Sequence, residues 1–172
     1  DRDVDVLGVG WLVPVKDWPL FLRVVARLVD LGVCRRVVLI GRGGEQHNLE
    51  EQVRRLGLEH RVTLLGELPR DQVLEWMARS RLLLHPARFE GLGLVMLEAQ
   101  AQGALVVSRP VGIACASERW TVAEDEDDLV AATAAALAQP RDPLAQRPWT
   151  AEATAAAYGA LYGRLAAGGS GG

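Results

Sequence analysis

Short apolar runs alternate with longer amphipathic segments along most of the chain, a pattern typical of repeated strand and helix units. The apolar runs predict six strands, at residues 4–10, 36–41, 62–66, 81–85, 104–108 and 119–122. The amphipathic segments predict five helices, at residues 18–31, 49–56, 70–79, 93–102 and 126–139. The first strands are apolar at consecutive positions, so both of their faces should be covered by other elements.

This order of elements predicts an α/β fold of the Rossmann-like kind, in which an open parallel sheet of about six strands carries helices on both faces. Gly32, Gly57 and Gly103 each follow a predicted helix, where a left-handed C-cap position favours glycine. After a proline-containing stretch at 139–148, the alanine-rich segment 149–165 predicts a C-terminal helix that docks back on the domain. One domain is therefore expected over residues 1–167, followed by a flexible Gly/Ser tail at 168–172.

Length and charge restrict the class of protein further. The 172 residues suit one domain or one lobe of a larger enzyme, and 19 Lys+Arg against 22 Asp+Glu give a net charge of −3. This mild acidity argues against a nucleic-acid partner, which would require a basic surface. Cys34 and Cys115 stand apart from other ligand-type residues, so no metal site or disulfide is expected. This use of cysteine makes a reduced, cytoplasmic location the expectation. No apolar run approaches the roughly 20 residues of a transmembrane segment, so a soluble protein is expected.

Two local features near strand ends are candidates for chemistry. Gly8-Val9-Gly10 follows the first strand, but a dinucleotide-binding fingerprint needs a small residue at position 13, where Val13 stands. This departure argues against a nicotinamide cofactor. His85 ends a strand just before Pro86, at the sheet edge where ligands bind in open parallel sheets, although a structural role is favoured for an isolated histidine.

A pair of carboxylates surrounds a predicted helix start. Glu90 precedes a helix that Gly91 and Gly93 are predicted to open, and Glu98 comes eight residues later. A continuous helix would place the two carboxylates about 12 Å apart along its axis, with an angular offset of about 80°. The unpaired amides at such a helix start favour a diphosphate, with Glu90 near a sugar hydroxyl and Glu98 near a ribose diol. The same spacing also fits ordinary surface charges.

Four segments together resemble a known family. PARFEGLGLVMLEAQAQG at 86–103 is similar to the signature Pro-Ser-x-x-Glu-Gly-Phe-Gly-Leu-x-x-Leu-Glu-Ala-x-Ala-x-Gly of the group 1, or family 4, retaining glycosyltransferases. VGWLVPVK at 9–16 resembles the family's Val-Gly-Arg-Leu-x-x-x-Lys, LIGRGGE at 39–45 its second glycine turn, and VTLLG at 62–66 its third strand. The resemblance covers most of the chain and is to the C-terminal, donor-binding lobe of the GT-B fold.

The resemblance implies roles for individual residues. Lys16 would contact the donor diphosphate, Glu90 the transferred sugar and Glu98 the ribose, so Lys16 and Glu90 are the candidate catalytic residues. The other positions implied in donor binding are Gly10, Trp11, Gly91, Leu92, Gly93 and Leu94. It also implies a UDP-, GDP- or ADP-sugar donor, retention of anomeric configuration, and no cofactor or obligatory metal. An N-terminal lobe absent from this chain would hold the acceptor and make any contact with an inner membrane face.

Several residues depart from the family pattern. Trp11 stands where the family has an arginine that joins the lysine on the diphosphate, which removes a permanent cation. Ala87 replaces the family serine, and Leu92 replaces the family phenylalanine. Val-Gly-Ile-Ala at 111–114 lacks the glutamate of the usual loop.

These departures leave two hypotheses of different classes. The first is a nucleotide-sugar-binding lobe of an active glycosyltransferase, in which Arg42 and Arg88 are the candidates to restore the missing charge. The isolated lobe would then bind donor and transfer little or nothing. The alternative is a degenerate, non-catalytic lobe that serves as a structural or interaction module.

Overall fold

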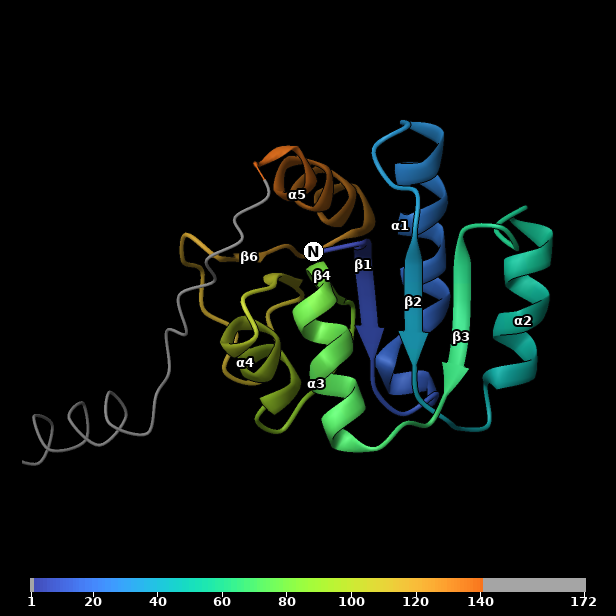
Figure 1. The fold of residues 1–172 in the computed structure, drawn as a ribbon, viewed down its shortest axis with the longest axis horizontal. Helices are drawn as coiled ribbons and strands as arrows, with labels where there is room; N and C mark the ends of the chain where they lie inside the picture. Colours follow the sequence, from blue (N-terminus) through green and yellow to red (C-terminus); the bar gives the residue numbers. More distant parts are fainter. Residues whose placement is uncertain (1, 141–172) are drawn as a thin grey trace, which may run out of the picture.

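A single sheet of six parallel strands forms the centre of the molecule, in the order β3-β2-β1-β4-β5-β6 (Figure 1). The computed structural model describes residues 2–140. The strands are β1 (Val4–Val9), β2 (Val37–Ile40), β3 (Val62–Gly66), β4 (Ser80–His85), β5 (Leu105–Ser108) and β6 (Trp120–Val122). Each overlaps a predicted strand, and the predicted open parallel sheet is confirmed.

The described residues also form five α-helices and a short 3-10 helix, and all but the last of these in chain order lie between strands. They are η1 (Pro14–Lys16), α1 (Trp18–Asp30), α2 (Gln46–Arg55), α3 (Arg70–Arg79), α4 (Leu94–Ala101) and α5 (Glu126–Ala138). The helix predicted at 49–56 begins earlier, at Gln46, and η1 was not predicted. The predicted C-cap glycines are confirmed, since Gly32, Gly57 and Gly103 have φ of 73°, 67° and 81°.

The helices cover the sheet on both faces and create two apolar cores. One core joins α1, α2 and α5 to the sheet and includes Phe21, Leu39 and Leu84. The other joins α3 and α4 to the opposite face and includes Met77, Met96 and Leu83. Leu83 and Leu84 are neighbours in β4 and point to opposite faces, which is why the central strands are apolar at consecutive positions.

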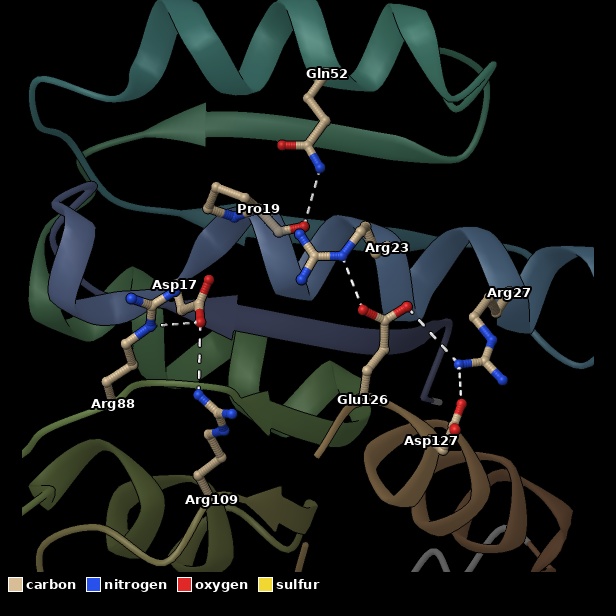
Figure 2. Close-up of polar contacts among 9 residues, drawn as sticks. All are labelled: Asp17, Pro19, Arg23, Arg27, Gln52, Arg88, Arg109, Glu126 and Asp127. Carbon is tan, nitrogen blue, oxygen red and sulfur yellow. Dashed lines mark hydrogen bonds and ion pairs between the residues drawn. The ribbon is translucent and has the colours of Figure 1, made fainter. Parts of the chain in front are cut away.

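Polar contacts join the helices on the α1 side (Figure 2). Arg23 Nε lies 2.8 Å from Glu126 Oε2, and Arg27 Nη1 lies 2.6 Å from Asp127 Oδ1, so α1 is paired with the start of α5. Gln52 of α2 donates to the carbonyl of Pro19 at 3.0 Å. Such exposed ion pairs contribute little to stability, and the apolar cores hold these helices on the sheet.

The strand order reverses between β1 and β4, the two central strands. The chain runs outward from β1 through β2 to β3, then returns to β4 and continues to β6 on the other side. At such a reversal, the loops that follow the two strands run in opposite directions. A crevice forms between them at the carboxyl ends of the strands, and open α/β sheets bind their ligands there. Here those loops are residues 10–17 after β1 and residues 86–93 after β4.

Some predictions lie beyond the described residues. These are the C-terminal helix at 149–165, the tail at 168–172 and nearly all of the proline-containing stretch at 139–148. The domain bounds of 1–167 therefore stay a prediction. None of the helices in the described part of the chain is long and apolar enough to cross a membrane.

Candidate functional site

Lys16 and Glu90 meet at the strand-order reversal. Lys16 ends η1 in the loop after β1, Glu90 lies in the loop after β4, and the Lys16 ammonium forms an ion pair with Glu90 Oε1. The two side chains are only 15% and 14% exposed. The structure thus brings together the two residues predicted to be catalytic, although 74 positions separate them in the chain.

His85 contacts the same carboxylate oxygen. Its Nε2 lies 2.8 Å from Glu90 Oε1, and its side chain is fully buried at the end of β4. A carboxylate oxygen only accepts hydrogen bonds, so a neutral His85 ring donates from Nε2 and leaves Nδ1 as an acceptor. Within residues 2–140, Nδ1 has no hydrogen-bond partner. His85 was predicted to be structural, and its contact with Glu90 was not foreseen.

The charges of this group follow from burial and from mutual contact. Burial lowers the pKa of His85 below its ordinary value, and the nearby Lys16 ammonium acts in the same direction, against the opposite effect of Glu90. Burial also raises the pKa of the Glu90 carboxyl, but the Lys16 ammonium and the His85 ring outweigh it and leave that pKa below its ordinary value. At neutral pH the group therefore contains an ammonium, a carboxylate and a neutral imidazole.

Two neighbouring loops hold the Glu90 loop. The amide of Arg88 donates to the carbonyl of Val15 at 2.8 Å, and the amide of Ile113 donates to the carbonyl of Leu92 at 3.1 Å. Gly112 has a left-handed φ of 59°, and a Cβ at this position would lie 2.5 Å from the Leu92 carbonyl oxygen. The loop after β5 therefore packs closely against the Glu90 loop, a contact that the sequence did not reveal.

The helix after Glu90 begins later than predicted. Gly93 is its N-cap, with a left-handed φ of 82°, and the first helical residue is Leu94. Gly91 and Glu90 lie outside the helix, so the separation of about 12 Å expected for a continuous helix does not apply. The left-handed turn at Gly93 redirects the chain and lets Glu90 reach Lys16 instead of following the helix axis.

Glu98 is bonded to a residue outside the ion-paired group. It lies on α4, where its Oε1 accepts hydrogen bonds from Arg70 Nη2 at 2.7 Å and Arg70 Nε at 3.1 Å. This bidentate contact joins α4 to the first turn of α3. The structure thus gives the second predicted carboxylate a different partner from the first.

Trp11 and Arg42 border a hollow of about 190 Å³ beside the reversal, with Gly10 among its lining residues. The Trp11 side chain is 56% exposed, and the Arg42 guanidinium lies 5.2 Å from the centre of its ring. Arg42 also pairs with Glu67, whose Oε2 lies 3.0 Å from Arg42 Nη1. Of the two candidates to restore a cation near position 11, Arg42 contacts Trp11, whereas Arg88 is bonded to Asp17.

The described part of the chain holds no cluster of three His, Cys, Asp or Glu side chains arranged to bind a metal ion. The side chains that meet at the reversal supply one ammonium, one carboxylate and a neutral imidazole, beside the loop amides.

Comparison with known proteins gives the family of this chain. The family described as "Glycosyl transferases group 1" matches residues 1–147. This chain belongs to the group 1 glycosyltransferases. The match confirms the resemblance seen in residues 9–16 and 86–103, and it covers every residue of the site described above.

Individual relatives agree with the family. The D-inositol 3-phosphate glycosyltransferase of Frankia alni is 32% identical over a 176-residue alignment that covers 95% of this chain and 42% of that protein. The gpi3 subunit of phosphatidylinositol N-acetylglucosaminyltransferase from Schizosaccharomyces pombe is 34% identical over 97 residues, 56% of this chain and 21% of that protein. The solved structure of Anabaena Alr3699/HepE in complex with UDP and glucose matches with a TM-score of 0.66 and 25% identity, over 80% of this chain and 40% of that one. This group 1 chain spans less than half the length of each of these proteins.

Proposed function

We propose that this chain is the donor-binding lobe of a retaining glycosyltransferase and that it binds a nucleotide-diphosphate sugar at the β1–β4 reversal. The observation that carries the proposal is the Lys16–Glu90 ion pair, which is held nearly out of water at the edge where open parallel sheets bind ligands. The UDP and glucose bound to the related HepE support a nucleotide sugar as the class of ligand.

The chemistry requires charge stabilisation more than proton transfer. As the bond between the sugar and the diphosphate breaks, negative charge grows on the diphosphate and positive charge on the anomeric carbon. In our proposal the Lys16 ammonium and the amides near Gly93 and Leu94 stabilise the diphosphate. Glu90 stays ionised because its pKa is low, so its carboxylate accepts hydrogen bonds from the sugar hydroxyls. We assign Glu98 to the ribose. In this proposal the ribose hydroxyls replace Arg70 as the hydrogen-bond partners of Glu98.

Arg42 supplies the cation that Trp11 does not. Its guanidinium is held over the exposed Trp11 ring, beside Gly10 and the start of the Lys16 loop. The ion pair with Glu67 uses Nη1, and a guanidinium has five N–H donors, so others remain for phosphate oxygens. This arrangement favours a working donor site over a degenerate one.

The proposal also assigns the acceptor to an N-terminal lobe outside this chain, because donor and acceptor must be held in one geometry for transfer. This chain spans 42% of the Frankia alni relative and 40% of HepE, which supports the assignment of the acceptor to a second lobe.

Titration calorimetry with UDP-, GDP- and ADP-glucose tests donor binding. We expect saturable binding of at least one of the three, weakened about tenfold or more by Lys16→Ala, since a hydrogen bond to a charged group is lost. Glu98→Ala should also weaken binding, whereas Arg55→Ala on the exposed face of α2 is the control and should not. The absence of saturable binding by the unmodified chain to all three donors would contradict the proposal.

The alternative of a degenerate lobe rests on Trp11 itself, which is exposed at the position of a family arginine. It makes a distinct prediction for Trp11→Arg. If that substitution creates donor binding where the unmodified chain has none, the degenerate lobe is favoured. If the unmodified chain already binds a donor, Trp11 has not abolished the donor site.

A further inference from the structure

Asp17 has an unusual backbone conformation for its residue type. With φ 53° and ψ 45°, it is the one non-glycine residue of the described chain with a positive φ. It follows η1 directly and is the N-cap of α1, but its carboxylate makes no capping hydrogen bond to that helix. Glycine or asparagine would fit the left-handed backbone at least as well. Neither helix capping nor backbone preference therefore explains an aspartate here.

The carboxylate is used instead to join loops (Figure 2). It is almost fully buried, and its Oδ2 lies 2.9 Å from Arg88 Nε and 3.5 Å from Arg109 Nη1. Arg88 belongs to the loop after β4, and Arg109 is the first residue after β5. Arg109 is fixed from its other side, because its Nε donates to the Glu124 carbonyl at 3.0 Å. A buried carboxylate is costly without such partners, so these contacts are mutually dependent.

Each of the three loops that meet at Asp17 also contributes to the candidate site. Lys16 is its immediate neighbour, and Glu90 follows Arg88 by two residues. Gly112, three residues after Arg109, lies so close to the Glu90 loop that a Cβ there would be 3.3 Å from Glu90 Cβ. A movement of either arginine loop away from Asp17 would therefore change the distance between Lys16 and Glu90.

We propose that Asp17 is a positioning residue of the donor site, which holds the Lys16 turn, the Glu90 loop and the Gly112 loop in one arrangement. Its own carboxylate does not contact the donor. It acts through Arg88 and Arg109, and its buried charge is what fixes both guanidinium groups. The effect on donor binding rests on the proposed function, whereas the effect on loop order does not.

Two variants separate the charge of Asp17 from its backbone. Asp17→Asn keeps the shape and tolerates the left-handed conformation, and Asp17→Gly removes the side chain without backbone strain. The matched control is Asp5→Asn, because the Asp5 carboxylate is similarly buried and lies 3.5 Å from Arg81 Nη1, at the opposite edge of the sheet. Asp5 also accepts hydrogen bonds from the amides of Arg35 and Arg36, so its loss should lower the melting temperature.

Amide hydrogen exchange measures the loop order without a ligand. Asp17→Asn and Asp17→Gly should accelerate exchange of the Arg88 and Ile113 amides, which bond to neighbouring loops, at least about fivefold. Asp5→Asn should accelerate exchange near the start of β2 and leave these two amides unchanged. Unchanged exchange at Arg88 and Ile113 in both Asp17 variants would overturn the proposal.

UDP affinity, measured by calorimetry on the same variants, tests the consequence for the site. We expect Asp17→Asn to weaken UDP binding about tenfold, with Arg88→Met adding little in the double variant, because both changes break one contact. Asp5→Asn should leave the affinity unchanged at a comparable loss of melting temperature. Accelerated exchange with unchanged UDP affinity would also overturn the proposal. If the unmodified chain binds no UDP, the affinity measurement is made with whichever of the other two donors binds. If none of the three binds, the proposed function fails, and the exchange result alone decides whether Asp17 orders the loops.

Discussion

One carboxylate oxygen of Glu90 accepts hydrogen bonds from two different side chains. Lys16 forms an ion pair with it, whereas burial lowers the pKa of His85 and keeps its ring neutral at pH 7. The neutral ring orients the carboxylate without cancelling its charge, so the Lys16 ammonium remains its only ionic partner among the described residues. The ordinary reading of an isolated histidine as structural is thus incomplete, since this one supports the carboxylate of the proposed donor site.

The buried His85 predicts a loss of stability in mild acid. Its pKa lies below the ordinary value of 6.5 in the folded chain, so below about pH 6.5 the unfolded chain takes up a proton that the folded chain resists. The free energy of unfolding should then fall between pH 7 and pH 5.5, by at most about 1 kcal/mol. His85→Gln, whose amide can still donate to Glu90, should flatten this dependence. Urea unfolding at both pH values measures it, and equal slopes for the two proteins would contradict it.

The two cysteines should differ in reactivity. Cys34 is buried, and burial raises the pKa of its thiol to about 12, whereas Cys115 is exposed. Because the thiolate is the reactive form, Ellman's reagent should label one thiol per folded chain rapidly and the second only after unfolding in urea. Cys115→Ser should abolish the rapid phase. Rapid labelling of two thiols in the folded protein would show that Cys34 is accessible.

At the level of elements, the loops around the site are fixed by close backbone approach. Gly112→Ala should be more harmful than Gly57→Ala, although both have a left-handed φ, because only the first meets the carbonyl oxygen of Leu92. We expect Gly57→Ala to cost about 1 kcal/mol of unfolding free energy from backbone conformation. Gly112→Ala should cost about 1–3 kcal/mol more and weaken UDP binding as the Glu90 loop shifts. Equal losses from the two substitutions would show that the contact with Leu92 can relax.

The elements themselves were largely predictable, because apolar periodicity is a local signal. The helix predicted at 126–139 is found at Glu126–Ala138, and the strand predicted at 81–85 is found at Ser80–His85. The side-chain contacts of the site were harder to predict from the sequence. Lys16 and Glu90 were selected through the family motif, whereas the Asp17–Arg88 contact joins residues 71 positions apart. Such a contact depends on which strands are neighbours, and no local pattern encodes that order.

At the scale of the whole molecule, the parallel sheet gathers the strand-end loops at one edge and leaves apolar side chains exposed there. Trp11, Phe89, Leu92 and Leu94 are between 50% and 68% exposed, although they border the proposed site. An edge of this kind is poorly suited to exclude water from a reacting diphosphate by itself. A second lobe over the same edge, as proposed for the acceptor side, would cover these side chains and complete the site.

This arrangement predicts that binding and turnover separate between the chain and the longer protein that we propose contains it. Lys16, Glu90 and Arg42 all lie on this chain, so calorimetry should give UDP affinities that agree within about threefold for the two proteins. Release of UDP from UDP-glucose should be at least about a hundredfold slower for the chain alone, because the acceptor is not oriented against the anomeric carbon. Lys16→Ala in the longer protein should lower both affinity and turnover, which identifies the donor site as the same in both. Comparable turnover by the chain alone would instead place acceptor binding, and therefore the complete active site, on this lobe.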